Sequence, residues 1–242
     1  METFNDADLS QFMKTFYGYG NLSARFWFIG MEEGGGNSFA EVQARLSAWK
    51  QLRKPELADL RDFHLLLRMP EFFTPPVKLQ RTWMQISRIK LAAEGKPHSI
   101  EELRTYQQNR LGRINGKTCL MELLPLPSPR TSAWAYAQWS TLPFLTMREA
   151  YHQSILPRRI AHIHKQILEN EPQAVIFYGI GYNSYWQTIA GKEVEFQEQG
   201  DFWSAITSRT IYLMIKHPNA RRLSNKYFEN VGTYIHDHLQ SL

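Results

Sequence analysis

Two glutamates stand beside a run of glycines in segment 30–37, GMEEGGGN. Glycines let a backbone approach a ligand closely, and free N–H groups at the start of a following helix can hold an anion. A carboxylate of Glu32 or Glu33 can then act as a general acid or base, or stabilise a positive charge. The alternative is a surface turn in which both glutamates are solvated. The GxGxxG and Walker spacings are missing, so neither a dinucleotide site nor a P-loop is indicated.

Segment 216–224, KHPNARRLS, carries a second group of side chains suited to chemistry. His217, fixed by the following proline, can donate a hydrogen bond to a developing negative charge. Arg221 and Arg222 can hold phosphates, and Leu223 can insert into a base stack. The alternative is an ordinary strand-to-helix turn in which Leu223 packs inward.

The elements that must position these two segments are four short apolar runs. They cover residues 26–30, 118–124, 174–178 and 210–215, and helical stretches separate them. Such runs predict an α/β fold with a central, mostly parallel four-stranded sheet and helices on both faces. Ligands bind at the carboxyl ends of such strands. We therefore expect Glu32 and His217 to face each other across one cleft.

Residues 54–117 predict a helical insertion, cut by several prolines, within a single domain that spans residues 1–242. Its part from 78 to 117 holds nine Lys and Arg against three Asp and Glu, a net charge of +6, whereas the whole chain carries +5. A concentrated basic surface suits a polyanion such as nucleic acid. A solvated basic helix face is the alternative.

The composition indicates a globular protein. Hydrophobic residues make up 43% of the 242 residues and charged residues 21%, which is enough apolar material for a sizeable core. There is no run of 18 apolar residues and no signal-like start, so we expect a cytoplasmic protein without a membrane partner. Cys119 is the only cysteine, which excludes an internal disulfide and a cluster held by several of the chain's own thiolates. We expect a monomer.

Together, the two segments resemble motifs of the uracil-DNA glycosylase superfamily, and the likeness spans most of residues 25–235. In that family a loop of the form Gly-x-Asp/Asn-Pro-Gly/Tyr follows the first core strand, and its polar residue positions the hydrolytic water. Glu32 occupies that place here. A His-Pro-Ser loop with a following leucine or arginine lies after the last strand of the family, and His217-Pro218-Asn219 is similar to it. Residues 120–125 resemble the strand whose Asn reads uracil, with Glu122 in that position.

The resemblance implies a monofunctional DNA glycosylase, which hydrolyses the N-glycosidic bond of a base flipped out of DNA without a cofactor or a metal. It implies catalytic roles for Glu32 and His217. The remaining candidates divide between base binding, by Met31, Phe39, Glu122 and Asn219, and DNA binding, by Arg221, Arg222 and Leu223.

Three departures from the family pattern bear on the substrate. Glu33 replaces the motif proline, Asn219 the serine, and Glu122 the uracil-reading asparagine. An ionised Glu only accepts hydrogen bonds, so it suits an exocyclic amine and disfavours uracil O4, although a buried Glu with a raised pKa could still donate. We therefore expect a damaged or modified base, such as a modified cytosine of phage DNA removed in antiviral defence.

Other functions remain open at this point. One is a uracil-DNA glycosylase of base-excision DNA repair, and another is a catalytically inactive nucleic-acid-binding module of the same fold, which the replacement of the motif proline by Glu33 favours. A third is a hydrolase of small nucleotides.

Overall fold

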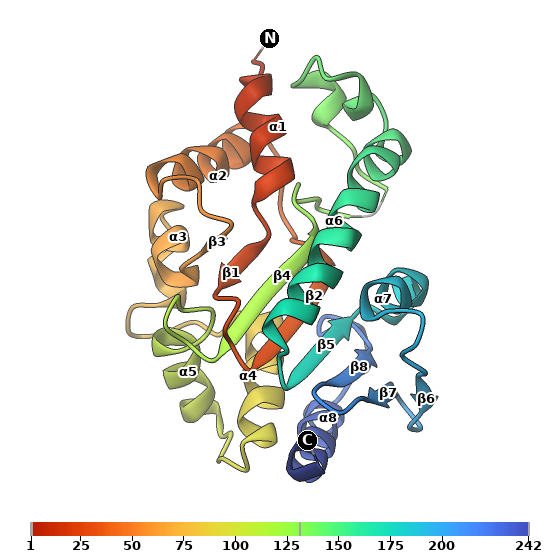
Figure 1. Cartoon of the computed structure of the whole chain (residues 1–242). Coiled ribbons are helices and arrows are strands. Elements are labelled where there is room, and N and C mark those ends of the chain that lie inside the picture. The colour runs from red at the N-terminus through yellow and green to blue at the C-terminus, as the bar shows by residue number, and fades with distance from the viewer. Residues whose placement is uncertain (1, 131, 242) are drawn as a thin grey trace.

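The computed structural model describes residues 2–130 and 132–241, in which one mixed sheet of eight strands forms the centre of the molecule (Figure 1). The strand order is β3-β1-β4-β2-β5-β8-β7-β6. The middle four strands run parallel: β4 (Thr118–Leu124), β2 (Phe26–Glu32), β5 (Ala174–Tyr178) and β8 (Ile211–Ile215). These four correspond to the apolar runs of the sequence, so the α/β class is confirmed.

The expectation of a four-stranded sheet was wrong, because four short strands extend both edges. β1 (Gly18–Gly20) pairs antiparallel with β4, and β3 (Leu57–Ala58) pairs with β1. On the other edge, β7 (Trp203–Ile206) pairs antiparallel with β8, and β6 (Gln197–Glu198) with β7. Strands of two to four residues are too short to show a hydrophobic period, so the sequence does not reveal them.

Strand β2 is also longer than predicted. The apolar run ends at Gly30, but backbone pairing with β4 continues to Glu32, which lies beside Leu124. Met31 and Glu32 therefore belong to a strand rather than to the loop. Since side chains alternate along a strand, these two residues point to opposite faces of the sheet.

Helices cover both faces. In Figure 1, α6 (Arg148–Asn170) crosses the front of the sheet, and α4 (Arg81–Ala93) lies behind it. The other helices are α1 (Asp6–Thr15), α2 (Phe39–Gln51), α3 (Leu60–Leu66), α5 (Ile100–Asn109), α7 (Asn183–Ala190) and α8 (Asn225–His238). Short 3-10 turns occur at Pro70–Phe72, Tyr136–Gln138, Pro143–Leu145, Ile180–Tyr182 and Leu239–Ser241.

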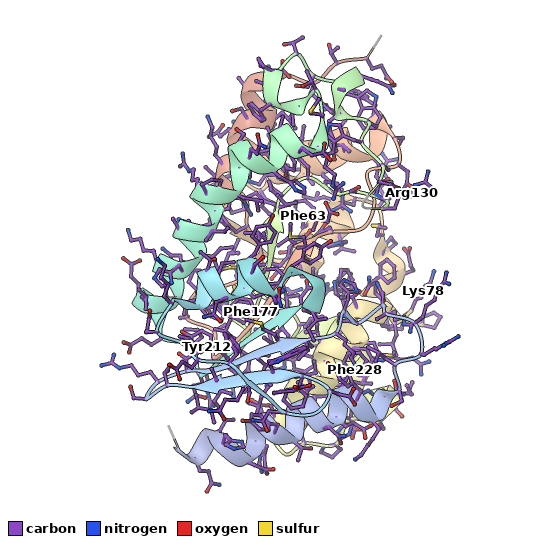
Figure 2. The ribbon with its side chains drawn as sticks, turned by 90° about the vertical axis from the view of Figure 1, so that its right-hand side faces the viewer. Phe63, Lys78, Arg130, Phe177, Tyr212 and Phe228 are labelled. Carbon is purple, nitrogen blue, oxygen red and sulfur yellow. The ribbon has the colours of Figure 1, made fainter. Side chains whose placement is uncertain are left out.

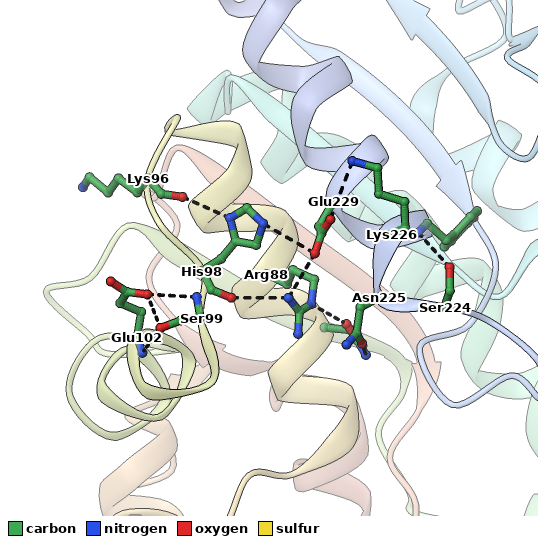
Figure 3. Close-up of polar contacts among 11 residues, drawn as sticks. Arg88, Lys96, His98, Ser99, Glu102, Ser224, Asn225, Lys226 and Glu229 are labelled. Carbon is green, nitrogen blue, oxygen red and sulfur yellow. Dashed lines mark hydrogen bonds and ion pairs between the residues drawn. The ribbon is translucent and has the colours of Figure 1, made fainter.

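The insertion at 54–117 contains the helices α3, α4 and α5 and the strand β3, joined by turns and loops, and it is built into the fold. Helix α4 packs on α8 so closely that a Cβ on Gly232 would lie 2.5 Å from the Cβ of Ala92. A polar network extends this contact. Oε1 of Glu229 on α8 lies 3.3 Å from Nη1 of Arg88 and 3.5 Å from Nε2 of His98 (Figure 3). The insertion thus depends on the rest of the domain for its packing.

The core fills both sides of the sheet. In Figure 2, Phe63, Phe177, Tyr212 and Phe228 lie within the molecule, and Lys78 and Arg130 lie on its right-hand side. Arg159 of α6 is the unusual core residue, since it is 1% exposed. Its guanidinium donates hydrogen bonds to the backbone carbonyls of Leu123, Met13, Phe16 and Glu122. These bonds join α1 and its following turn to β4.

Candidate active site

A pocket of about 160 Å³ lies at the carboxyl ends of the parallel strands, where the sequence predicts a site. Glu32 from β2, Glu122 from β4 and His217 after β8 all line it. The expected meeting of Glu32 and His217 at one pocket is therefore confirmed. The other lining residues are Tyr19, Glu33, Gly34, His64, Gln80, Thr82, Trp83, Ile86, Leu120, Tyr178 and Asn219.

Gly30 makes room for a contact across the floor of this pocket. It pairs with Glu122 in the sheet, and a Cβ added to it would lie 2.2 Å from the Tyr178 ring and 2.4 Å from Oε2 of Glu122. Both distances are too short for any side chain. The glycine therefore allows Tyr178 of β5 to reach across β2 to Glu122 of β4.

The Tyr178 hydroxyl donates a hydrogen bond to Oε1 of Glu122 at 2.5 Å. The other oxygen, Oε2, is buried and has no partner among the described residues. Burial raises the pKa of Glu122 well above its ordinary value; the Tyr178 hydrogen bond lowers it, and the charges of Glu33 and Glu32 raise it further. A neutral Glu122 can donate a hydrogen bond from Oε2. The expectation that uracil is disfavoured assumed an ionised Glu122, which only accepts hydrogen bonds.

Glu32 is held by an arginine that the sequence gives no reason to choose. Nη2 of Arg148, the first residue of α6, donates to Oε1 of Glu32, and Nη1 donates to the Ser128 hydroxyl at 2.9 Å. Oε2 of Glu32 is buried without a partner among the described residues. Burial raises the pKa of Glu32 above its usual range, and the Arg148 guanidinium offsets part of that rise.

Glu33 has a different environment. It forms an ion pair with Arg45 of α2, which is 8% exposed and also donates to the Gly34 carbonyl at 3.4 Å. Both glutamates are thus compensated by arginines, but the buried carboxylate oxygen without a partner belongs to Glu32.

His217 is oriented by the backbone of its own loop. The N–H of Asn219 donates to Nδ1 of His217 at 3.0 Å, so the neutral ring carries its proton on Nε2. Burial lowers the pKa of His217, which favours this neutral form. The ring packs edge-on to Tyr178, with centroids 5.5 Å apart. Asn219 in turn donates its side-chain N–H to the Thr82 hydroxyl of α4 at 2.9 Å, which ties the loop to the insertion.

A second histidine, which sequence reasoning missed, lines the pocket from α3. Nδ1 of His64 donates to the Leu60 carbonyl at 2.8 Å, which leaves Nε2 as an acceptor. Burial lowers the pKa of His64 to about 4, so the ring is neutral at physiological pH. Its edge packs on Trp83 of α4, with centroids 4.8 Å apart. Only packing of the insertion brings His64 here, and no local motif marks it.

Unsatisfied buried atoms gather at this pocket. Of the buried side-chain polar atoms without a partner among the described residues, three belong to lining residues: Oη of Tyr19, Oε2 of Glu32 and Oε2 of Glu122. Leaving such a group unpaired costs about 1–3 kcal/mol. Such groups are commonly satisfied by ordered water or an ion, or they serve a catalytic role.

Several predicted site residues lie outside the pocket lining. Met31 is 7% exposed and points to the face opposite Glu32. Phe39, the first residue of α2, stacks on Phe4 with centroids 4.5 Å apart. Leu223 is partly buried and packs against the hydrophobic core, as the alternative interpretation of its loop expects. Arg221 and Arg222 are exposed beside the pocket loop.

Several basic residues of the insertion form ion pairs within the protein. Arg88 forms an ion pair with Glu229, and Arg113 forms one with Asp59. Glu94 forms ion pairs with Lys90, Lys96 and Lys117. Lys78 and Arg81 are exposed, and Nη2 of Arg81 donates to the Ala220 carbonyl at 3.4 Å. The basic surface near the pocket therefore combines the start of α4 with the loop before α8, rather than the whole segment 78–117.

No family model matches the chain, and no curated protein matches it. Within residues 2–130 and 132–241, no helix combines the length and apolar character needed to cross a membrane. The same part of the chain contains no cluster of three or more His, Cys, Asp or Glu side chains that could hold a metal ion.

Proposed function

We propose that the protein is a DNA N-glycosylase, which hydrolyses the bond between deoxyribose and a base flipped out of DNA. The observation that carries the proposal is the presence of Glu32, Glu122 and His217, from three separate strands or strand ends, in one pocket at the carboxyl edge of the sheet. Three further features support it: the two sequence segments 30–37 and 216–224, the exposed Arg221 and Arg222 in the second of them, and a pocket large enough for a base ring.

The proposed chemistry separates two opposite charges. As the glycosidic bond breaks, the sugar gains positive charge and the leaving base gains negative charge. Glu32 stabilises the sugar and orients the water, whose oxygen bonds to the sugar carbon. The Nε2–H group of His217 stabilises the departing base, and the proton that the water loses on bonding to the sugar is balanced by the proton that the base takes up. Glu32 suits the first role better than Glu33, because Oε2 of Glu32 is a buried carboxylate oxygen without a partner among the described residues.

The pocket is large enough for a pyrimidine ring. An apolar cavity of about 150 Å³ is known to hold one benzene ring, and this pocket measures about 160 Å³. A single six-membered ring fits this volume. Any large substituent of a modified cytosine would have to project through the pocket mouth.

The state of Glu122 determines which pyrimidine is preferred. A neutral carboxyl that accepts from Tyr178 and donates from Oε2 matches a carbonyl such as uracil O4, whereas an ionised one matches an amine. Because burial favours the neutral form, uracil returns as a candidate substrate beside modified cytosines. Uracil excision belongs to repair, whereas excision of modified cytosine belongs to defence against phage DNA.

The test is excision from single- and double-stranded DNA carrying uracil, cytosine, hypoxanthine or 5-substituted cytosines, followed by alkaline cleavage of abasic sites. We expect cleavage on a pyrimidine substrate, and a loss of about 10²–10³-fold in His217→Ala, the usual effect of removing a preorganised donor. Glu32→Gln should also lose most activity, while Glu169→Gln, an exposed matched change on α6, should retain it.

A catalytically inactive DNA-binding module is the second candidate, favoured by the Arg45 ion pair that engages Glu33 at the motif-proline position. DNA binding without strand breakage on every substrate would support that module and reject the glycosylase.

A further inference from the structure

A second ligand site lies at the opposite end of the parallel strands. A pocket of about 380 Å³ is bounded by the last turn of α4, by α5 and by the residues that precede β4. It shares no lining residue with the candidate active site. Both pockets lie along α4, and Thr82 and Lys90 are separated by about 12 Å of helix rise.

Positive charge is in excess around this pocket. Four cations line it, namely Lys90, Lys96, Lys117 and Arg110, against the single carboxylate of Glu94. The carboxylate oxygens of Glu94 lie 2.5 Å from Nζ of Lys90, 2.8 Å from Nζ of Lys96 and 3.8 Å from Nζ of Lys117. One carboxylate cannot neutralise three ammonium groups and a guanidinium, so this pocket keeps a net charge of about +3, which falls to about +1 when Glu101 and Glu102 of an adjoining pocket are counted.

The burial of the Lys90 side chain distinguishes this pocket from a solvated basic surface. The Lys90 side chain is 2% exposed, and its Nζ lies over the rings of Phe26 and Tyr106, at 5.3 and 5.4 Å from their centroids. Lys96 and Lys117 are more than half exposed and stand at the rim. Burial lowers the pKa of Lys90, and the carboxylate of Glu94 offsets part of that effect. An anion placed between the rim lysines and Lys90 would offset more of it.

An adjoining pocket of about 350 Å³ has a different character. It shares Leu91, Lys96, Tyr106 and Arg110 with the cationic pocket and adds the apolar ring of Pro97. Glu102 also lines it, but its carboxylate accepts hydrogen bonds from the N-cap residue Ser99. The neighbouring Glu101 is exposed and can accept a hydrogen bond from an amino group.

We propose that these two adjoining pockets form a nucleotide site, with phosphates between Lys90, Lys96 and Lys117 and an amine-bearing base over Leu91 and Pro97. Glu101 repels phosphate and accepts from the amine, so it fixes the direction of the ligand. The nucleotide is either free in solution or part of a nucleic-acid strand. The proposal is independent of the glycosylase activity, because it uses none of the residues assigned to that reaction.

The test is calorimetric titration of the whole protein with ADP, pyrophosphate, adenosine and a short oligodeoxyadenylate at low and high salt. We expect ADP to bind more tightly than pyrophosphate or adenosine, and to weaken as salt rises. Lys96→Glu and Lys117→Glu should each weaken ADP binding by about tenfold, because each reverses a charge at the phosphate end. Lys192→Glu, an equal change at a distant exposed lysine, should leave ADP binding unchanged.

The arms of the experiment separate the outcomes. Oligonucleotide binding that ADP displaces, and that Lys96→Glu weakens, supports the site with nucleic acid as the source of the nucleotide. ADP binding without oligonucleotide binding supports it with a free nucleotide. ADP binding weaker than about 1 mM, pyrophosphate binding as tight as ADP, or equal losses in Lys192→Glu would overturn the proposal.

Discussion

Replacing Glu122 with glutamine separates the two ways in which this residue could read a base. If Glu122 is neutral, glutamine keeps the acceptor that receives the Tyr178 hydroxyl at 2.5 Å and places an N–H donor where Oε2–H stood. The variant should then resemble the wild type on uracil-containing DNA at neutral pH. If the wild-type carboxyl is ionised, it places a hydrogen-bond acceptor opposite uracil O4, which is also an acceptor.

The magnitude follows from the cost of that mismatch. An unpaired buried acceptor costs about 1–3 kcal/mol, which corresponds to a loss of about 5- to 150-fold in rate. Because burial raises the pKa of Glu122, wild-type excision of uracil should fall as pH rises through that raised value. Glu122→Gln should not show this fall, since its amide does not titrate.

Stability should follow the same group. In the unfolded chain Glu122 loses its proton near its ordinary pKa of 4.5, whereas the folded protein retains it to higher pH. The free energy of unfolding should therefore decrease as pH rises from about 4.5 to the raised value, because the folded state binds more protons there. The same decrease should be smaller in Glu122→Gln.

The assay is single-turnover excision of uracil by the wild type and Glu122→Gln across a pH series, with urea unfolding at the same pH values. Tyr178→Phe serves as a further variant, which removes the hydrogen bond but keeps the ring. A Glu122→Gln variant that is strongly impaired at neutral pH, and whose pH profile still follows the wild type, would refute a neutral Glu122.

Two further substitutions test packing. Gly30→Ala should cost about 1–3 kcal/mol of stability and impair excision, because its Cβ would displace Tyr178 or Glu122. Gly181→Ala, with nothing within 4 Å of its Cβ and outside the pocket lining, should behave as wild type. Equal effects of the two substitutions would show that the close approach at Gly30 is unimportant. Arg159→Met should lower the free energy of unfolding by about 3–5 kcal/mol, since four backbone carbonyls lose a buried donor. Arg158→Met, the exposed neighbour on α6, should change it by less than about 0.5 kcal/mol, and urea titration of both variants decides the matter.

The residues that the sequence predicted correctly for the pocket lie in or soon after the short apolar runs. Glu32, Glu122 and His217 could be placed together because continuous hydrophobic runs identify the parallel strands, and parallel strands share a carboxyl edge. Met31 and Phe39 are close to Glu32 in the sequence but lie outside the pocket lining. Strand alternation turns Met31 away, and the aromatic contact with Phe4 holds Phe39 elsewhere.

The remaining site residues arise from contacts between distant segments, which a single sequence does not reveal. His64 reaches the pocket only because the insertion folds back over the sheet, and Arg148 reaches Glu32 from a helix 116 residues further along the chain. The insertion charge shows the same limit. The sequence gives the number of basic residues, but it does not reveal that Arg88 pairs with Glu229 inside the fold or that three lysines converge on Glu94.

The unpaired polar atoms also bear on the choice between an enzyme and a DNA-binding module. A module that only holds DNA phosphates needs exposed cations such as Arg221 and Arg222, and gains nothing from a recessed pocket. Among the described residues, the buried oxygens Oη of Tyr19, Oε2 of Glu32 and Oε2 of Glu122 have no partner. Leaving each one unpaired would cost about 1–3 kcal/mol, which apolar side chains of similar shape would avoid. A base that enters the pocket and hydrogen-bonds to these atoms gives a physical reason for their presence. The arrangement therefore favours a protein that takes a nucleotide base into its interior over one that binds DNA only at the surface.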